Sequence, residues 1–145
     1  MKKLLIAAAL MTALSASAAN WIRIADGDDV RLIMDLDTFT AAKADDGTPL
    51  VAAVFQFVKG GQPNGGFAYL TAIESCPAGG GQLWARRFIE KDGSWETVGN
   101  YFWSADGGRL YDFAGMALCA TLRNKIEQNS PQKPTQKLPK DKSNV

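Results

Sequence analysis

Hydrophobic and polar residues alternate along most of the chain between positions 20 and 104. Alternation with a period of two is typical of a strand that buries one face. Six runs follow this pattern and are separated by turn residues: 21–24, 30–35, 50–59, 67–75, 82–90 and 95–104. Because the links between them are short, we expect consecutive strands to pair antiparallel, since parallel neighbours need long crossovers.

Three stretches between these runs carry turn or link signals. Residues 37–42 are expected to form a short helical turn or an irregular link. The glycine-rich stretch 60–66 is expected to be a loop, because glycine and proline both weaken a strand ladder. Residues 91–94 contain an Asp-Gly pair, which predicts a hairpin turn between the last two strands.

The period changes after Gly108, and residues 109–126 predict a helix with Asp106 as its N-cap. At about 100° per residue, its apolar side chains form two stripes on nearly opposite sides. The first stripe is Leu110, Phe113, Met116, Ala117 and Ala120, and the second is Tyr111, Ala114, Leu118 and Leu122. One stripe must cover the sheet, and the pattern does not decide which. The other is expected either to be buried under loops or to form a partner surface, for which the candidates are Leu110, Tyr111, Phe113, Leu118 and Leu122.

The first nineteen residues have the pattern of a signal peptide. Lys2 and Lys3 precede an apolar run at 4–14, and small residues follow at 15–19. We expect cleavage after Ala19, although cleavage one residue earlier is also compatible, and a periplasmic or secreted product. The apolar run is too short to cross about 30 Å of hydrocarbon, and the cleavage region offers no cysteine for a lipid anchor.

The C-terminal end differs in composition from the rest of the chain. From position 124 onward there are five lysines, two acidic residues and three prolines. Such a stretch buries too little apolar surface to offset its ordering entropy. We therefore expect one domain at 20–126 and a disordered tail at 127–145. The alternative for the tail is a basic arm that contacts an anionic surface.

The chain has two cysteines, Cys76 and Cys119. In an exported protein an even number of cysteines predicts a disulfide, and their wide spacing excludes a CxxC redox pair. Closing a loop of this length stabilises a fold by about 4 kcal/mol in the chain-entropy model. The predicted fold is α+β, with roughly six antiparallel strands covered by a C-terminal helix that the disulfide tethers.

The composition disfavours most catalytic chemistry. The chain has no histidine, which excludes a Ser-His-Asp triad, a Cys-His pair and a histidine-bearing zinc site. The acidic clusters at 26–29, 35–37 and 45–46 lack the spacing of a calcium loop and have the composition of turns. Nothing favours a glycosidase-like carboxylate pair, and a formal charge of +1 does not attract nucleic acid. We expect no enzymatic activity, cofactor, metal, nucleic-acid partner or membrane span.

Several motifs occur in a recognisable order. They are Trp21 after the signal site, the segment 34–39 with its Thr-Phe step, residues 69–74 leading into Cys76, the turn at 91–95, Phe102-Trp103, and Cys119 in the last helix. This order resembles the surface-adhesin protein E-like domains of Gram-negative bacteria. The resemblance implies a helix tied to the concave side of a six-stranded sheet, and a non-enzymatic protein that binds host proteins and can dimerise. The adhesin of that family is lipid-anchored, whereas this chain lacks the lipobox cysteine.

Two functions are expected on these grounds. The first is an exported, adhesin-like interaction module that binds a protein partner, with a homodimer through the exposed side of the helix as one form. The alternative is a periplasmic inhibitor or accessory subunit of a cell-wall enzyme such as lysozyme, because small exported domains with a disulfide suit that task.

Overall fold

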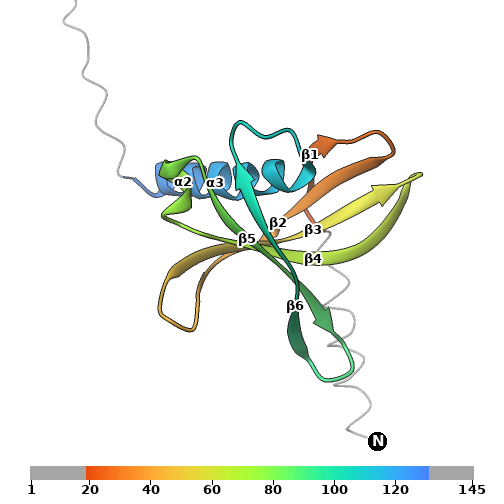
Figure 1. Ribbon diagram of the computed structural model, residues 1–145, viewed down its shortest axis with the longest axis horizontal. Coiled ribbons are helices and arrows are strands. Elements are labelled where there is room, and N and C mark those ends of the chain that lie inside the picture. Colours follow the sequence, from red (N-terminus) through yellow and green to blue (C-terminus); the bar gives the residue numbers. More distant parts are fainter. Residues whose placement is uncertain (1–18, 131–145) are drawn as a thin grey trace, which may run out of the picture.

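The computed structural model describes residues 19–130, apart from the side chains at positions 64 and 65. One antiparallel sheet contains six strands in the order of the sequence (Figure 1): β1 (Trp21–Asp26), β2 (Val30–Lys43), β3 (Pro49–Lys59), β4 (Gln62–Ala72), β5 (Gly80–Ile89) and β6 (Ser94–Ser104). A short helix, α2 (Ser75–Ala78), links β4 to β5, and a long helix, α3 (Leu110–Asn129), lies across one face of the sheet. The predicted α+β fold is confirmed.

Strand β2 is longer than predicted, because residues 37–42 continue the strand through a bulge. Asp35 pairs with Val54, and the next paired residue, Thr40, lies opposite Ala52. Within the bulge the hydroxyl of Thr38 donates a hydrogen bond to the carbonyl oxygen of Asp35 (2.7 Å) and accepts one from the backbone N–H of Val54 (2.8 Å). A side chain thus replaces the missing ladder bonds and lets the strand resume.

The predicted loop at 60–66 is also mostly strand. Gly60 and Gly61 have φ values of 57° and 77°, and β4 begins at the following residue. Two consecutive residues with positive φ form a tight hairpin turn whose twist matches the flanking strands. Glycine adopts these angles without steric cost, so two glycines are enough to reverse the chain.

The predicted disulfide is confirmed. Cys76 lies in α2 and Cys119 in α3, with their Cα atoms 5.4 Å apart. The sequence pattern did not predict α2, which spans four residues. Its first residue, Ser75, lies against Gly81 of β5, where a Cβ atom would overlap the serine side chain. The disulfide therefore joins α2, which lies between β4 and β5, to the middle of α3.

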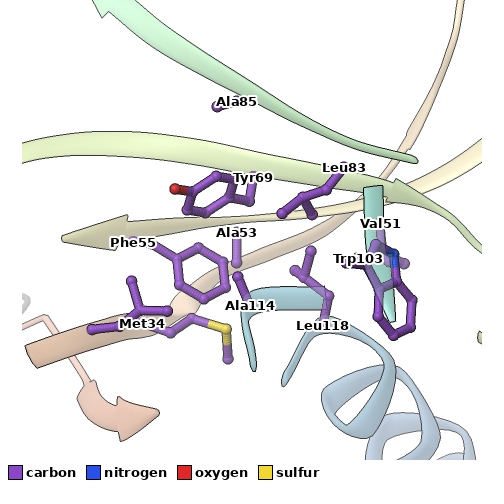
Figure 2. Packing of buried hydrophobic residues seen from close by; sticks show 11 residues of the cluster. Met34, Val51, Ala53, Phe55, Tyr69, Leu83, Ala85, Trp103, Ala114 and Leu118 are labelled. Carbon is purple, nitrogen blue, oxygen red and sulfur yellow. The ribbon is translucent and has the colours of Figure 1, made fainter. Parts of the chain in front are cut away.

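The main core lies between α3 and the inner face of the sheet, which is the face turned toward the helix. Figure 2 shows the side chains of Phe55 and Tyr69 beside Ala114, and Trp103 beside Leu118. The rings of Phe55 and Tyr69 meet edge to face at 5.1 Å. The buried indole of Trp103 donates a hydrogen bond to the hydroxyl of Thr71 (2.9 Å). Every strand from β2 to β6 contributes to this core.

Close packing settles which stripe of α3 turns inward. Ala114 and Leu118 are fully buried, so the second predicted stripe faces the sheet directly, while Leu110, Met116 and Ala117 of the first stripe are partly buried against the same core. Gly115 lies directly on the ring of Trp103, and a Cβ atom at this position would overlap the indole. Phe113 is half-buried and Ala120 is exposed on the other side of the helix.

Both ends of α3 differ from the prediction. The N-cap is Arg109 rather than Asp106, because the carboxylate of Asp112 turns back and accepts hydrogen bonds from the backbone N–H groups of Arg109 and Ser104, both at 2.9 Å. The helix continues to Asn129, so residues 127–129 are helical instead of belonging to the tail. Apart from residue 19, the predicted signal peptide lies outside the described residues, and so does the predicted tail beyond Ser130.

A second, smaller core lies on the outer face, which is the face of the sheet opposite α3. Its buried members are Leu50, Ala52, Leu70 and Ala72. No described helix covers them, and the partly buried side chains of Ala42, Ala44, Ala68 and Trp84 pack against them. The sheet thus buries apolar residues on both faces, whereas the alternation predicts one.

Candidate functional site

Cross-strand neighbours form rows on the outer face. One row runs from β3 to β6 through Val54, Ala68, Arg86 and Thr97, and the next runs through Ala52, Leu70, Trp84 and Asn100. Each row contains one alanine on β3 or β4, Ala68 in the first and Ala52 in the second, and its small side chain leaves space between larger neighbours. The register of β3 and β4 brings these two alanines together, and a hollow opens above them.

This outer hollow has a volume of about 260 Å³, and its lining residues are Thr38, Thr40, Ala52, Ala53, Val54, Ala68, Leu70, Arg86 and Trp95. Its floor is apolar, since Ala52 and Leu70 belong to the small core. Its walls come from β2 on one side and from the β5–β6 hairpin on the other. Figure 1 shows the β2–β3 and β5–β6 hairpins both extending away from α3, on either side of the central strands.

Large apolar side chains are exposed along the β5–β6 hairpin. Phe102 is 69% exposed, Trp95 is 48% exposed and Phe88 is 46% exposed. The rings of Phe88 and Trp95 lie 5.2 Å apart and support each other. Val98 and Tyr101 are also exposed on β6, and among residues 19–130 only Ile126 is an exposed large hydrophobic residue outside this hairpin. Tyr101 stacks on Tyr111 of α3 and therefore lies on the helix side, whereas the contacting rings of Phe88 and Trp95 form an exposed apolar patch, which is typical of an interaction surface.

The edge of β6 is poorly suited to pairing with another strand. Val98 has no partner on β5, because Ala85 pairs with Gly99 and Arg86 with Thr97. A bulge of this kind interrupts the ladder that an added strand would need. Near the end of β6, the carbonyl oxygen of Phe102 already accepts a hydrogen bond from the guanidinium of Arg109 (3.2 Å). The face of the hairpin, rather than its edge, is the accessible feature.

Two consecutive arginines of β5 differ in their surroundings. Arg87 forms an ion pair with Glu96 and points to the opposite side of the strand from Arg86. Arg86 lines the outer hollow and is exposed. Within residues 19–130, the structure has no ion pair and no side-chain hydrogen bond for Arg86. The only charged side chain at the hollow is therefore available to a ligand.

The structure separates the five predicted partner-surface residues. Leu118 is fully buried in the main core, so its assignment to a surface was wrong. Tyr111 stacks on Tyr101 at 5.1 Å. Leu110 lines a groove of about 740 Å³ on the inner face, and Leu122 lines a different hollow beside the disulfide. Phe113 is half-buried and lies outside the main core. These residues form no single surface on α3.

The sequence analysis did not predict the outer hollow, and Trp84 itself packs against the small core instead of lining the hollow. The alternation of β5 already places Trp84, Arg86 and Phe88 on one side of the strand. That signal favours a mixed aromatic and cationic face. The contribution of Trp95 and of the alanines depends on cross-strand register, which a single run of residues does not show.

Two perturbed side chains of the inner face have structural roles. Burial, with a smaller contribution from Tyr101, raises the pKa of Tyr69 to about 12, so its phenol stays protonated near neutral pH. Hydrogen bonds from Arg109, above all, lower the pKa of Asp112 from 3.8 to about 2. Its carboxylate is saturated by Ser104 and Arg109 and holds the start of α3.

Among residues 19–130, no group of three or more histidine, cysteine, aspartate or glutamate side chains is placed so that it could hold a metal ion. Over the same residues, no helix has the length and apolar content needed to cross a membrane.

Comparison with family models, with curated proteins and with solved structures finds no match to this chain. The resemblance to surface-adhesin protein E-like domains therefore stays a prediction from the motifs. The functional assignment depends on the outer face of the β5–β6 hairpin.

Proposed function

We propose that this protein is an exported, non-enzymatic interaction module that binds a protein partner through the outer face of the β5–β6 hairpin. The observation that carries the proposal is the outer hollow, with the half-exposed ring of Trp95 at one wall beside the guanidinium of Arg86, which has no ion pair among residues 19–130. Tryptophan and arginine are enriched at the energetic centres of protein interfaces, where they border well-packed pockets.

The exposed aromatic rings support the same proposal. Phe88, Trp95 and Phe102 are among the most water-exposed large hydrophobic residues of the described chain. Covering such rings removes apolar surface from water, which is favourable in most protein associations. A partner that covers the hairpin face gains this contribution without requiring any change in the main core.

Two further features support export and an adhesin-like role. The disulfide between Cys76 and Cys119 fits an oxidising compartment such as the periplasm or the exterior. The basic, apolar and small residues at 1–19 have the pattern of a cleaved signal. The resemblance of the motifs to surface adhesins favours a host protein as the partner, and this is the narrower form of the proposal.

Affinity capture tests the proposal with matched variants. The wild type, the double variant Trp95→Ala/Phe102→Ala and the control Ile126→Ala are immobilised and exposed to cell-envelope extract and to extracellular matrix proteins. Ile126 is 58% exposed but lies on α3. We expect a protein that binds the wild type and the control, and whose binding falls about tenfold or more in the double variant. Sedimentation of the same proteins shows whether that partner is a second copy.

Two results would contradict the proposal. One is a captured protein that binds the double variant as well as it binds the wild type. The other is a captured protein that the Ile126→Ala control loses to the same extent, because this places the interface on the helix.

A further inference from the structure

We infer that the partner inserts an apolar side chain into the outer hollow and places a carboxylate beside it, against Arg86. This inference rests on the proposed function, because it names the chemistry of the segment that the hairpin face binds. It defines an acidic-apolar pair of side chains on the partner as the recognition element.

The size of the hollow favours a side chain over a free small molecule. Pockets that enclose drug-sized ligands have volumes of roughly 300–1,000 Å³, and the outer hollow has about 260 Å³. Its floor consists of Ala52, Ala68 and Leu70, which offer no side-chain hydrogen bond. An apolar group that enters it loses contact with water and gains contact with these residues.

The polar groups around the hollow are mostly occupied. The hydroxyl of Thr38 already donates to Asp35 and accepts from Val54. The hydroxyl of Thr40 donates to the carbonyl oxygen of Ala41 (3.3 Å). Neither threonine therefore has a free donor for a ligand in this arrangement. Two side-chain donors of the lining remain, the indole N–H of Trp95 and the guanidinium of Arg86, and only the guanidinium is charged.

The chemistry of Arg86 selects the acidic half of the pair. A guanidinium presents several N–H donors in a planar fork that matches a carboxylate through two parallel hydrogen bonds. Arg86 lies between its cross-strand neighbours Ala68 and Thr97. Trp95 also lines the hollow, and it lies diagonally opposite Arg86 on β6, two residues before Thr97. Arg87, its neighbour in sequence, already has Glu96 as an ion-pair partner and serves as an internal control.

A peptide selection tests the inference on the full protein. A phage-displayed library of random 12-residue peptides is selected on the wild type, and peptides that Trp95→Ala does not bind are kept. We expect these peptides to share an aspartate or glutamate next to an aliphatic or aromatic residue. Their dissociation constants are then measured by fluorescence anisotropy for the wild type, Arg86→Gln, Arg87→Gln and Ala68→Leu.

We expect Arg86→Gln to weaken binding about tenfold or more and Arg87→Gln to change it less than about twofold. Ala68→Leu fills the hollow and is expected to abolish binding, while circular dichroism shows that the variant is folded. Neutralising the acidic residue of the peptide should weaken binding to the wild type by the same factor. It should have no further effect on Arg86→Gln, which is the signature of a direct pair.

The outcomes separate the inference from the proposed function. Peptides that depend on Trp95 but show no acidic residue, or that bind Arg86→Gln as well as the wild type, overturn the inference and leave the hairpin face in place. If no selected peptide depends on Trp95, both the inference and the proposed function are wrong.

Discussion

The two faces of the sheet are built from different side chains. The inner face carries large residues, such as Phe55, Tyr69 and Trp103, and α3 covers them and is fixed by the disulfide. The outer face has small residues at its centre, Ala52 and Ala68, and no described helix lies over it. The helix thus covers the inner face, whereas Ala52 and Ala68 leave a hollow on the outer face.

This difference separates stability from recognition. Contacts of the inner face are complete within the chain, because Trp103 has its hydrogen-bond partner and Asp112 has its arginine. At the outer face, Trp95 remains half-exposed and Arg86 lacks an ion-pair partner among residues 19–130. We therefore expect substitutions on the inner face to change unfolding, and those on the outer face to change binding.

Replacing Trp103 by alanine should have the largest effect on stability. The ring is buried beneath Gly115 and donates a hydrogen bond to Thr71. Removing a buried aromatic ring of this size costs about 3–5 kcal/mol of unfolding free energy. Urea unfolding followed by circular dichroism measures the loss. A cost below about 1 kcal/mol would show that the helix-covered face is not the main core.

Removing the disulfide should cost somewhat less. The double variant Cys76→Ser/Cys119→Ser frees a loop of 43 residues in the unfolded chain, which lowers the unfolding free energy by about 2–5 kcal/mol. Reduction of the wild type with a thiol should lower the urea midpoint as much as the double substitution does. Unchanged midpoints in both experiments would contradict the role of the bridge in holding α3.

Asp112 should make stability depend on pH at the acidic end. Because its folded pKa of about 2 lies below its ordinary value of 3.8, its contribution is complete above pH 3.8. The contribution is lost as the pH falls toward 2, since the unfolded chain binds the proton more readily. Asp112→Asn should cost about 1–3 kcal/mol at pH 7 and remove this acid-dependent part.

Asp106 provides the control for that experiment, because it was the predicted N-cap. In the structure Asp106 is exposed, and the N-cap is Arg109, whose backbone N–H donates to the carboxylate of Asp112. Asp106→Asn should therefore change the unfolding free energy by less than about 0.5 kcal/mol. A larger loss for Asp106→Asn than for Asp112→Asn would reverse the assignment of the cap.

The smallest effect on stability is expected on the outer face. Trp95→Ala removes a half-exposed ring and its contact with Phe88, so the cost should be less than about 1.5 kcal/mol. Its partner binding should nevertheless fall about tenfold or more. Unfolding and binding measured on the same preparation show whether the two effects separate. A cost comparable to that of Trp103→Ala would contradict the distinction between the faces.

The sequence was informative where local signals decide the structure. The alternation and the turn residues predict the strand order, and the two cysteines predict the bridge that ties α2 to α3. The inward stripe of α3 was not predictable, because it depends on Gly115 meeting Trp103 across the core. The bulge in β2 depends on a hydrogen bond from Val54 to Thr38, which joins residues far apart in the sequence.

The candidate site was less predictable than the fold. Trp84, Arg86 and Phe88 share one side of β5 by simple alternation, so part of the hairpin face is visible in the sequence. The outer hollow itself appears only when the register brings Ala52 of β3 close to Ala68 of β4. Small residues give no local signal of this kind, because alanine is common in strands, helices and loops alike.

The most direct test of the central claim is an NMR titration of the full, isotope-labelled protein with a selected peptide. We predict that backbone amide shifts change at Ala68, at 84–88 and at 95–102, while the amides of α3 from Leu110 to Asn129 stay within error. Changes confined to the amides of α3 would show that the partner binds the helix side and would contradict this assignment.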